Sequence, residues 1–122
     1  MVNKSVLTAK TGERVRMFFG NGGPNLASSF HVIGAIFDKV YRDADLTSPP
    51  GRNIQTTLVP PGGATVVEFV PQVPGTYTMV DHAIFRVDKG AVGFLSVSGN
   101  DRPDIYHADT PPKNCVGCKL HA

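Results

Sequence analysis

Hydrophobic and polar residues alternate along much of the chain with a period of two, which is the pattern of β-strands with one solvated face. Residues 14–19 (RVRMFF) and 76–82 (TYTMVDH) show it most plainly, and residues 64–70 (ATVVEFV) form an apolar run that also predicts a strand. No long stretch has the 3.6-residue period of a helix, so a helical or α/β fold is not expected. The predicted strands are residues 5–10, 14–19, 29–36, 37–41, 54–59, 64–70, 76–82 and 92–98.

The segments between these strands are rich in glycine and proline. Residues 42–53 are polar, contain the sequence SPPG and are predicted to be a surface excursion. Residues 83–89 are predicted to form one or two helical turns, closed by Gly90 as the C-cap. Short strands with turn signals about every 8 to 12 residues predict an all-β fold, a Greek-key β-sandwich. Residues 1–99 form the predicted domain, and residues 100–122 an irregular C-terminal tail.

The predicted core consists of inward-facing residues of both sheets. In residues 14–19 the inward face is ambiguous, because Phe18 competes with Met17 and Phe19 for the apolar side. The residues nominated for the core are Val15, Met17, Phe19, Val32, Val67, Phe69, Tyr77, Met79, Phe94 and Leu95.

Size and charge exclude several function classes. A chain of 122 residues predicts one domain, and its net charge of +2, without a cluster of Lys or Arg, does not predict nucleic-acid binding. The apolar runs are too short to cross a membrane. No apolar segment follows residues 1–4, so no signal peptide is predicted in this chain, which leaves a cleaved signal or a larger precursor open.

Two histidines are placed where chemistry is plausible. His31 lies just inside a strand after the glycine-rich residues 20–25 (GNGGPN), and His82 ends a strand after Asp81. The strand that carries His31 and the turn that precedes it would fix the position of the imidazole, a group suited to proton transfer or metal binding near neutral pH. In a sandwich, two such strand ends can fall at the same end of the domain. Either each imidazole satisfies backbone groups, or one is a metal ligand and the other a proton donor.

The residue types do not predict a complete blue-copper site. Such a site needs two histidines and a cysteine, usually with a weak axial methionine, and the cysteines of this chain, Cys115 and Cys118, lie in the tail. A lone histidine cannot hold a copper ion. His82 as a ligand therefore requires residues from another chain or domain.

Several motifs together resemble one known family. Residues 20–25 (GNGGPN), 28–34 (SSFHVIG), 37–41 (FDKVY), 80–82 (VDH) and 89–91 (KGA) are similar to the second, C-terminal cupredoxin domain of the copper-containing, nitric-oxide-forming nitrite reductases. The resemblance extends from about residue 6 to residue 99 and implies a cupredoxin-like domain over residues 1–99. It also implies two such domains in each subunit, three subunits in a trimer, and a periplasmic or otherwise extracytoplasmic location.

The resemblance implies a role for four residues. His31 corresponds to the catalytic histidine that relays a proton to nitrite, and Ile33 to the apolar residue that crowds the substrate above the copper. Thr57 corresponds to the threonine that orients the catalytic histidine. His82 corresponds to the histidine that the second domain lends to the type 2 copper of a neighbouring subunit.

The same resemblance implies that this chain holds only part of a site. In the family, the first domain supplies the type 1 copper site, the other two type 2 histidine ligands and an aspartate for proton delivery, and none of those motifs is found here. The chain alone is therefore expected to be inactive and to need a domain or chain that carries the type 1 copper. The alternative is a non-catalytic cupredoxin-like interaction or assembly domain. A self-contained copper electron carrier is disfavoured, because no cysteine lies in a strand.

The tail contains a C-x-x-C motif, Cys115 to Cys118. Attachment of a c-type haem would need histidine at position 119, where Lys119 stands. A degenerate haem motif, a disulfide, a metal site with His121 and two ordinary thiols remain open interpretations.

Overall fold

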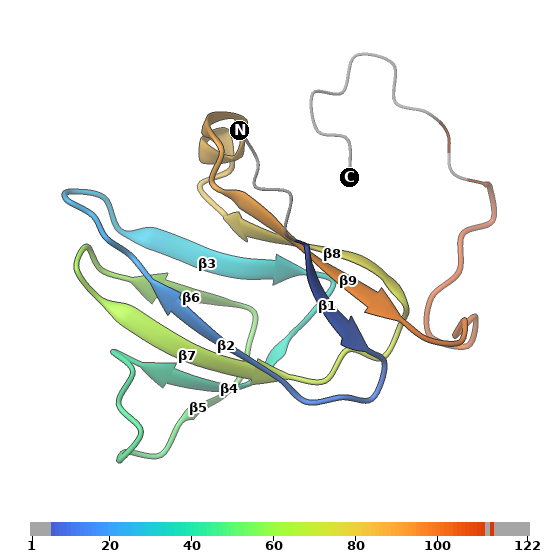
Figure 1. Ribbon diagram of the computed structural model, residues 1–122, viewed down its shortest axis with the longest axis horizontal. Helices are drawn as coiled ribbons and strands as arrows, with labels where there is room; N and C mark the ends of the chain where they lie inside the picture. The colour runs from blue at the N-terminus through green and yellow to red at the C-terminus, as the bar shows by residue number, and fades with distance from the viewer. Residues whose placement is uncertain (1–5, 112, 114–122) are drawn as a thin grey trace.

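A computed structural model describes residues 6–111 and 113 of the chain. Within these residues, nine strands and one 3₁₀ helix are found, and the strands form two facing sheets (Figure 1). None of the described helices is long and apolar enough to cross a membrane. The elements are β1 (Leu7–Lys10), β2 (Val15–Gly20), β3 (Ser28–Ile33), β4 (Phe37–Arg42), β5 (Gly51–Ile54), β6 (Thr56–Val59), β7 (Ala64–Phe69), β8 (Gly75–Asp81), η1 (Ile84–Lys89) and β9 (Val92–Ser98).

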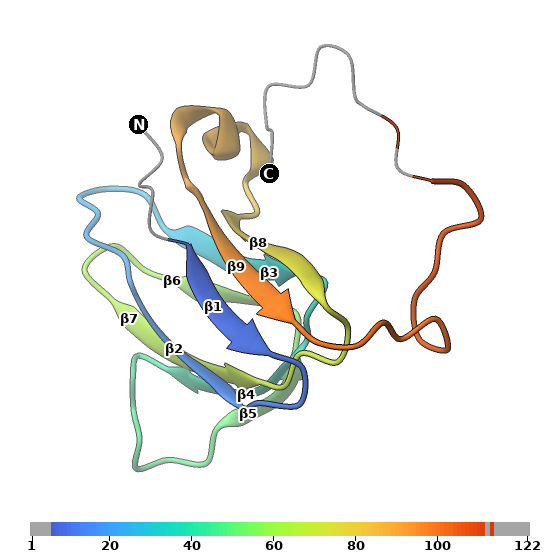
Figure 2. The same ribbon diagram turned by 45° about the vertical axis from the view of Figure 1, so that its right-hand side comes forward.

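The connectivity is that of a Greek-key sandwich. One sheet has the order β1-β9-β8-β3-β6 and the other the order β2-β7-β4-β5. All pairings are antiparallel except that of β1 with β9. The chain crosses repeatedly between the sheets, so that β4 with β5 and β8 with β9 are the consecutive strands that pair. Figure 2 shows the two layers, with η1 at one end of the five-stranded sheet. The predicted all-β sandwich with one short helix is confirmed.

The core lies between the sheets, and all but one of the nominated residues belong to it. A row of aromatic rings connects the layers: Phe19 stacks on Phe30 with ring centroids 4.2 Å apart, and Phe30 stacks on Phe37 at 5.8 Å. The nominated residues found buried are Val32, Val67, Phe69, Tyr77 and Leu95. Those partly buried against them are Val15, Met17, Phe19 and Met79.

The alternation of side chains along a strand determines which side of the sheet Phe18 and Phe94 face. Phe18 points outward and is 75 % exposed, because its neighbours Met17 and Phe19 face the core. Phe94 was nominated for the core, and that prediction is wrong. Its neighbour Leu95 faces inward, so Phe94 lies on the outer face of the sheet, where it lines a hollow beside η1.

Several predicted strand ends differ from the observed ones by one residue, and three predicted segments need larger corrections. Residues 42–53 were predicted to be an excursion, but Gly51–Ile54 form β5 and pair with the edge of β4. The segment 54–59 is divided at Gln55, so that its two parts belong to different sheets. The segment 29–36 ends as a strand at Ile33. The predicted short helix is confirmed as η1, with Gly90 as a left-handed C-cap at φ 98°.

Candidate functional site

The glycine-rich loop before β3 is held in place by Asn21. The side-chain amide of Asn21 donates hydrogen bonds to the carbonyl oxygens of Leu26 (2.8 Å) and Val59 (3.1 Å), and its Oδ1 accepts one from the backbone N–H of Gly23 (3.0 Å). These contacts join the loop to the end of β6. Because the loop leads directly into β3, they fix where that strand begins.

The structure brings the two predicted histidines together at one end of the five-stranded sheet. His31 is carried by β3, and His82 is the first residue after β8. Their ring centroids lie 5.3 Å apart and the ring planes are inclined by 65°. The backbone N–H of His82 donates to the carbonyl oxygen of Ser29 (2.8 Å), which ties the two segments to each other.

The hydrogen bond of the His31 ring determines which nitrogen carries the proton. Nδ1 lies 2.7 Å from the carbonyl oxygen of Gln55. A carbonyl only accepts, so Nδ1 is the donor and, in the neutral ring, Nε2 is the unprotonated nitrogen. Among the described residues, no hydrogen bond is made to Nε2. This nitrogen is therefore the one that can accept or deliver a proton.

The threonine beside His31 is Thr56, which corrects the predicted Thr57. Oγ1 of Thr56 lies 3.4 Å from Nδ1 of His31, and the two residues are opposite each other in the β3–β6 ladder. Thr57 is opposite Phe30 and therefore points to the inner face of the sheet. Its side chain is 2 % exposed, and within the described part of the chain its Oγ1 has no hydrogen-bond partner.

Exposed apolar side chains lie on the elements that carry the two imidazoles and on the elements next to them. Ile33 lies two residues after His31 on the same face of β3 and is 47 % exposed. It lines a hollow of about 410 Å³ with Ile84 and Phe85 of η1, both of which are also exposed. Leu58, on the neighbouring strand β6, is 68 % exposed. Contiguous exposed apolar side chains with polar groups at their rim are typical of a surface that another protein covers.

Asp81, directly before His82, is an ionised carboxylate in the interior of this end of the sheet. Its Oδ1 accepts hydrogen bonds from the backbone N–H groups of Ser29 and Ala83 (both 3.1 Å), and its Oδ2 accepts one from Nη1 of Arg86 (2.6 Å). Burial raises the pKa of Asp81, but these hydrogen bonds and the charge of Arg86 outweigh it, so that the pKa lies below its ordinary value.

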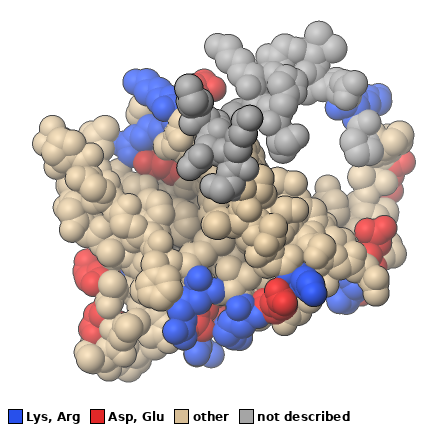
Figure 3. Space-filling model, viewed as in Figure 1, with Lys and Arg blue, Asp and Glu red and all other residues tan. Residues whose placement is uncertain are grey.

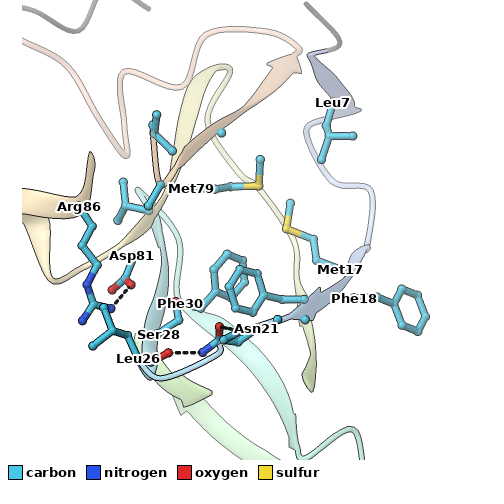
Figure 4. A pocket seen from close by; sticks show the side chains of 18 of the residues that line it. Leu7, Met17, Phe18, Asn21, Leu26, Ser28, Phe30, Met79, Asp81 and Arg86 are labelled. Atoms are coloured by element: carbon cyan, nitrogen blue, oxygen red, sulfur yellow. Dashed lines mark hydrogen bonds and ion pairs between the residues drawn. The ribbon is translucent and has the colours of Figure 1, made fainter. Parts of the chain in front are cut away.

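A second, larger hollow of about 690 Å³ lies away from the imidazoles (Figure 4). Met17, Phe30 and Met79 contribute to its apolar walls, and Asp81 and Arg86 stand at one side. Neither His31 nor His82 lines it. Size alone therefore does not locate the candidate site, which is defined by the imidazole pair.

Comparison with known proteins shows which family the chain belongs to. Residues 1–100 match a family model described as multicopper oxidase. The chain belongs to the multicopper oxidase family. Within it, the relatives found include the copper-containing nitrite reductases of Neisseria meningitidis and Neisseria gonorrhoeae, each 56% identical over 102 residues. These residues make up 83% of this chain and 26% of each relative. The chain thus spans about a quarter of the length of these curated relatives.

Solved structures of copper nitrite reductases from other organisms share the β-sandwich. The copper nitrite reductase of Nitrosomonas europaea matches with a TM-score of 0.74 and 34% identity, over 83% of this chain and 35% of that chain. The copper-containing nitrite reductase of Thermus scotoductus matches with a TM-score of 0.71 and 35% identity, over 79% and 23%. The predicted resemblance and the cupredoxin-like fold are confirmed.

For this multicopper oxidase family member, the described donors fit copper only in part. An imidazole is a suitable ligand for copper, and the His82 ring makes no hydrogen bond to the described protein atoms that would compete. No group of three or more His, Cys, Asp or Glu that could hold a metal is found among residues 6–111 and 113. A copper centre at His82 would need further ligands from elsewhere. Cys115, Cys118 and His121, for which a metal site or a disulfide was considered, lie outside the described residues.

Proposed function

We propose that this chain is the part of a copper nitrite reductase that supplies His82 as one ligand of a type 2 copper and His31 as the proton-relaying histidine. The remaining ligands would come from another chain or domain, which would also carry the type 1 copper. The observation that carries the proposal is the pair of imidazoles 5.3 Å apart on an exposed face, in a chain 56% identical to copper-containing nitrite reductases. The same relationship leads us to propose a location outside the cytoplasm.

The reaction proposed is the reduction of nitrite to nitric oxide. One nitrite ion, two protons and one electron give one nitric oxide and one water, so a proton donor must stand near the nitrite oxygen that leaves as water. A copper ion held by His82 and by ligands from elsewhere would supply the electron and a Lewis-acid contact for nitrite. The residues of this chain then have to hold and move the protons.

His31 is arranged for that proton transfer. Because Nδ1 is committed to the carbonyl oxygen of Gln55, a proton gained from solvent resides on Nε2 and is delivered from that nitrogen. Transfer from Nε2 leaves the Nδ1 hydrogen bond intact, so the ring keeps its position through the cycle. In this proposal Thr56, whose Oγ1 lies 3.4 Å from Nδ1, is the threonine that orients the ring.

Ile33 and the exposed apolar residues have two roles in this proposal. Ile33 would restrict the orientation of nitrite by its volume, since it lies on the face of β3 that carries His31. The apolar side chains of Ile84, Phe85 and Leu58 would be covered by the neighbouring chain or domain that completes the copper site. We propose a homotrimer for the complete enzyme, so that each site is shared.

The decisive experiment replaces the two histidines separately, in the protein assembled with the chain or domain that carries the type 1 copper. His31→Ala should lower kcat for nitrite by at least about a hundredfold and leave the type 2 copper bound. His82→Ala should remove the type 2 copper, seen as loss of its electron paramagnetic resonance signal and of about half the bound copper.

His107→Ala is the matched control, because His107 is an exposed tail histidine whose Nε2 lies 3.5 Å from Oδ1 of Asp109. It should behave as wild type in both measurements. If His31→Ala and His82→Ala both retained wild-type activity and copper, the catalytic proposal would fail, and the alternative of a non-catalytic assembly domain would be favoured.

A further inference from the structure

The loop that carries His82 leaves the sheet at one point and returns close by. His82 is its first residue, and the backbone N–H of Asp81 donates to the carbonyl oxygen of Ala91 (3.3 Å) where the loop rejoins β9. The ring of His82 makes no hydrogen bond within the part of the chain that the structure describes. The position of the ring therefore depends on the backbone of this loop and on what holds that backbone.

The carboxylate of Asp81 joins the two segments that carry the imidazoles. It accepts one hydrogen bond from the N–H of Ser29, two residues before His31, and another from the N–H of Ala83, the residue after His82. A shift of the loop relative to β3 would break one of these bonds. The carboxylate thus fixes the relation between the two strands at the point where the imidazoles meet.

Arg86 ties the helix to the same place. Its Nη1 donates to Oδ2 of Asp81 and to the carbonyl oxygen of Ala27, both at 2.6 Å (Figure 4 shows the contact with Asp81). The Arg86 backbone accepts a hydrogen bond from the N–H of Ala91 (3.0 Å). The side chains of Arg86 and Asp81 are only 21 % and 9 % exposed, so this ion pair is screened less than one at the surface.

We infer that Asp81 and Arg86 are positioning residues for the metal ligand His82, acting as a clamp that sets the His82 ring against His31. The inference rests on the proposed function of His82 and adds two residues for which the family resemblance implied no role. Groups that orient a ligand without touching the metal typically change metal affinity about 10- to 100-fold when removed. The clamp predicts an effect of that order.

The test uses the protein assembled with the chain or domain that carries the type 1 copper and supplies the other type 2 ligands, with Cu²⁺ as the probe of the type 2 site. Arg86→Gln and Asp81→Asn should each raise the Kd of the type 2 site for Cu²⁺ at least about tenfold. Both should also accelerate hydrogen exchange of the His82 amide, whose bond to Ser29 the clamp protects. Arg86→Lys keeps the charge and a donor and should recover part of both effects.

Arg16→Gln is the matched control, because Arg16 also makes a 2.6 Å ion pair with a buried carboxylate, Glu68, but on the other sheet. It should lower stability without changing the Kd, and without accelerating His82 exchange beyond the global change. Wild-type exchange at His82 in both Arg86→Gln and Asp81→Asn would overturn the inference. A wild-type Kd of the type 2 site for Cu²⁺ in His82→Ala would instead contradict the proposed function, and the exchange measurement would still decide on the clamp.

Discussion

Nδ1 of His31 lies 2.7 Å from the carbonyl oxygen of Gln55, the single residue that separates β5 from β6. β5 belongs to the four-stranded sheet and β6 to the five-stranded sheet, so Gln55 is where the chain crosses between them. The crossover at Gln55 thus presents its carbonyl oxygen to the His31 ring, and this hydrogen bond determines which nitrogen of the neutral imidazole carries the proton.

The first prediction concerns the tautomer of His31. When the ring is neutral, its proton should reside on Nδ1, because the Gln55 carbonyl can only accept. Long-range ¹H–¹⁵N correlation spectra of the labelled chain distinguish the two tautomers directly. His107, which is exposed, serves as the reference and should show a mixture. A neutral His31 with its proton on Nε2 would contradict the assigned role of that nitrogen.

The second prediction separates Thr56 from Thr57. The Oγ1 of Thr57 is buried without a partner, so Thr57→Val should leave the free energy of unfolding unchanged or raise it by up to about 1 kcal/mol. Thr56→Val should change stability by less than about 0.5 kcal/mol, because Thr56 is exposed, but should shift the ring resonances of His31.

Urea unfolding and the same correlation spectra measure both effects of these threonine variants. Thr57→Ser is a further control, since it keeps the hydroxyl and removes only a methyl group from the core. A large change at the His31 ring in Thr57→Val, with none in Thr56→Val, would restore the position that the sequence suggested.

The alternation of apolar and polar residues was sufficient to predict the β-sandwich, because each strand has one continuous buried face. The strand predicted at residues 64–70 was found to within one residue and that at 92–98 with its predicted bounds, since apolar residues with strand preference leave few alternatives. The pairing of His31 with His82 was anticipated because both lie at strand ends next to loops. The distance between them could not be predicted, since it depends on the antiparallel register of β3 with β8.

The missed features have a common cause, which is that tertiary partners decide them. The strand β5 has the polar sequence GRNI, and it is a strand only because β4 offers an edge for pairing. Thr56 and Thr57 have the same side chain, so only the register of β6 against β3 determines which of them lies opposite His31. The Asp81–Arg86 clamp has no recognisable spacing, because η1 is a 3₁₀ helix whose geometry only the structure reveals.

The third prediction tests the inward face of β2. Phe19→Ala should lower the free energy of unfolding by about 2–4 kcal/mol, because the ring stacks on Phe30 at 4.2 Å in the core. Phe18→Ala should change it by less than about 0.5 kcal/mol, since that ring is mostly exposed. Chemical denaturation compares the free energies of unfolding of the two variants, which lose the same side-chain atoms from adjacent positions. Equal losses would contradict the observed face.

A buried carboxylate organises the outer face of the four-stranded sheet. Glu68, on the central strand β7, is 1 % exposed, and its oxygens lie 2.6 Å from Nη2 of Arg16, 3.5 Å from Nη1 of Arg14 and 3.8 Å from Nζ of Lys39. Basic and acidic side chains form a row along the lower edge of the molecule in Figure 3. Burial raises the pKa of Glu68. The hydrogen bond and charge of Arg16, together with the charges of Lys39 and Arg14, lower the pKa by more than burial raises it. The pKa of Glu68 therefore lies below its ordinary value of 4.5.

The fourth prediction is that this network makes the sandwich acid-sensitive. Because the pKa of Glu68 is lower in the folded than in the unfolded chain, its stabilisation is complete above about pH 4.5 and is lost as the pH falls through the folded-state value. Glu68→Gln should lower the free energy of unfolding at pH 7 by about 1–3 kcal/mol and flatten its decline in acid. Asp109→Asn, at a side chain that is 96% exposed, should leave both unchanged. Thermal unfolding at several pH values measures the effect, and an equally steep acid decline in Glu68→Gln would assign it to other carboxylates, such as Asp81.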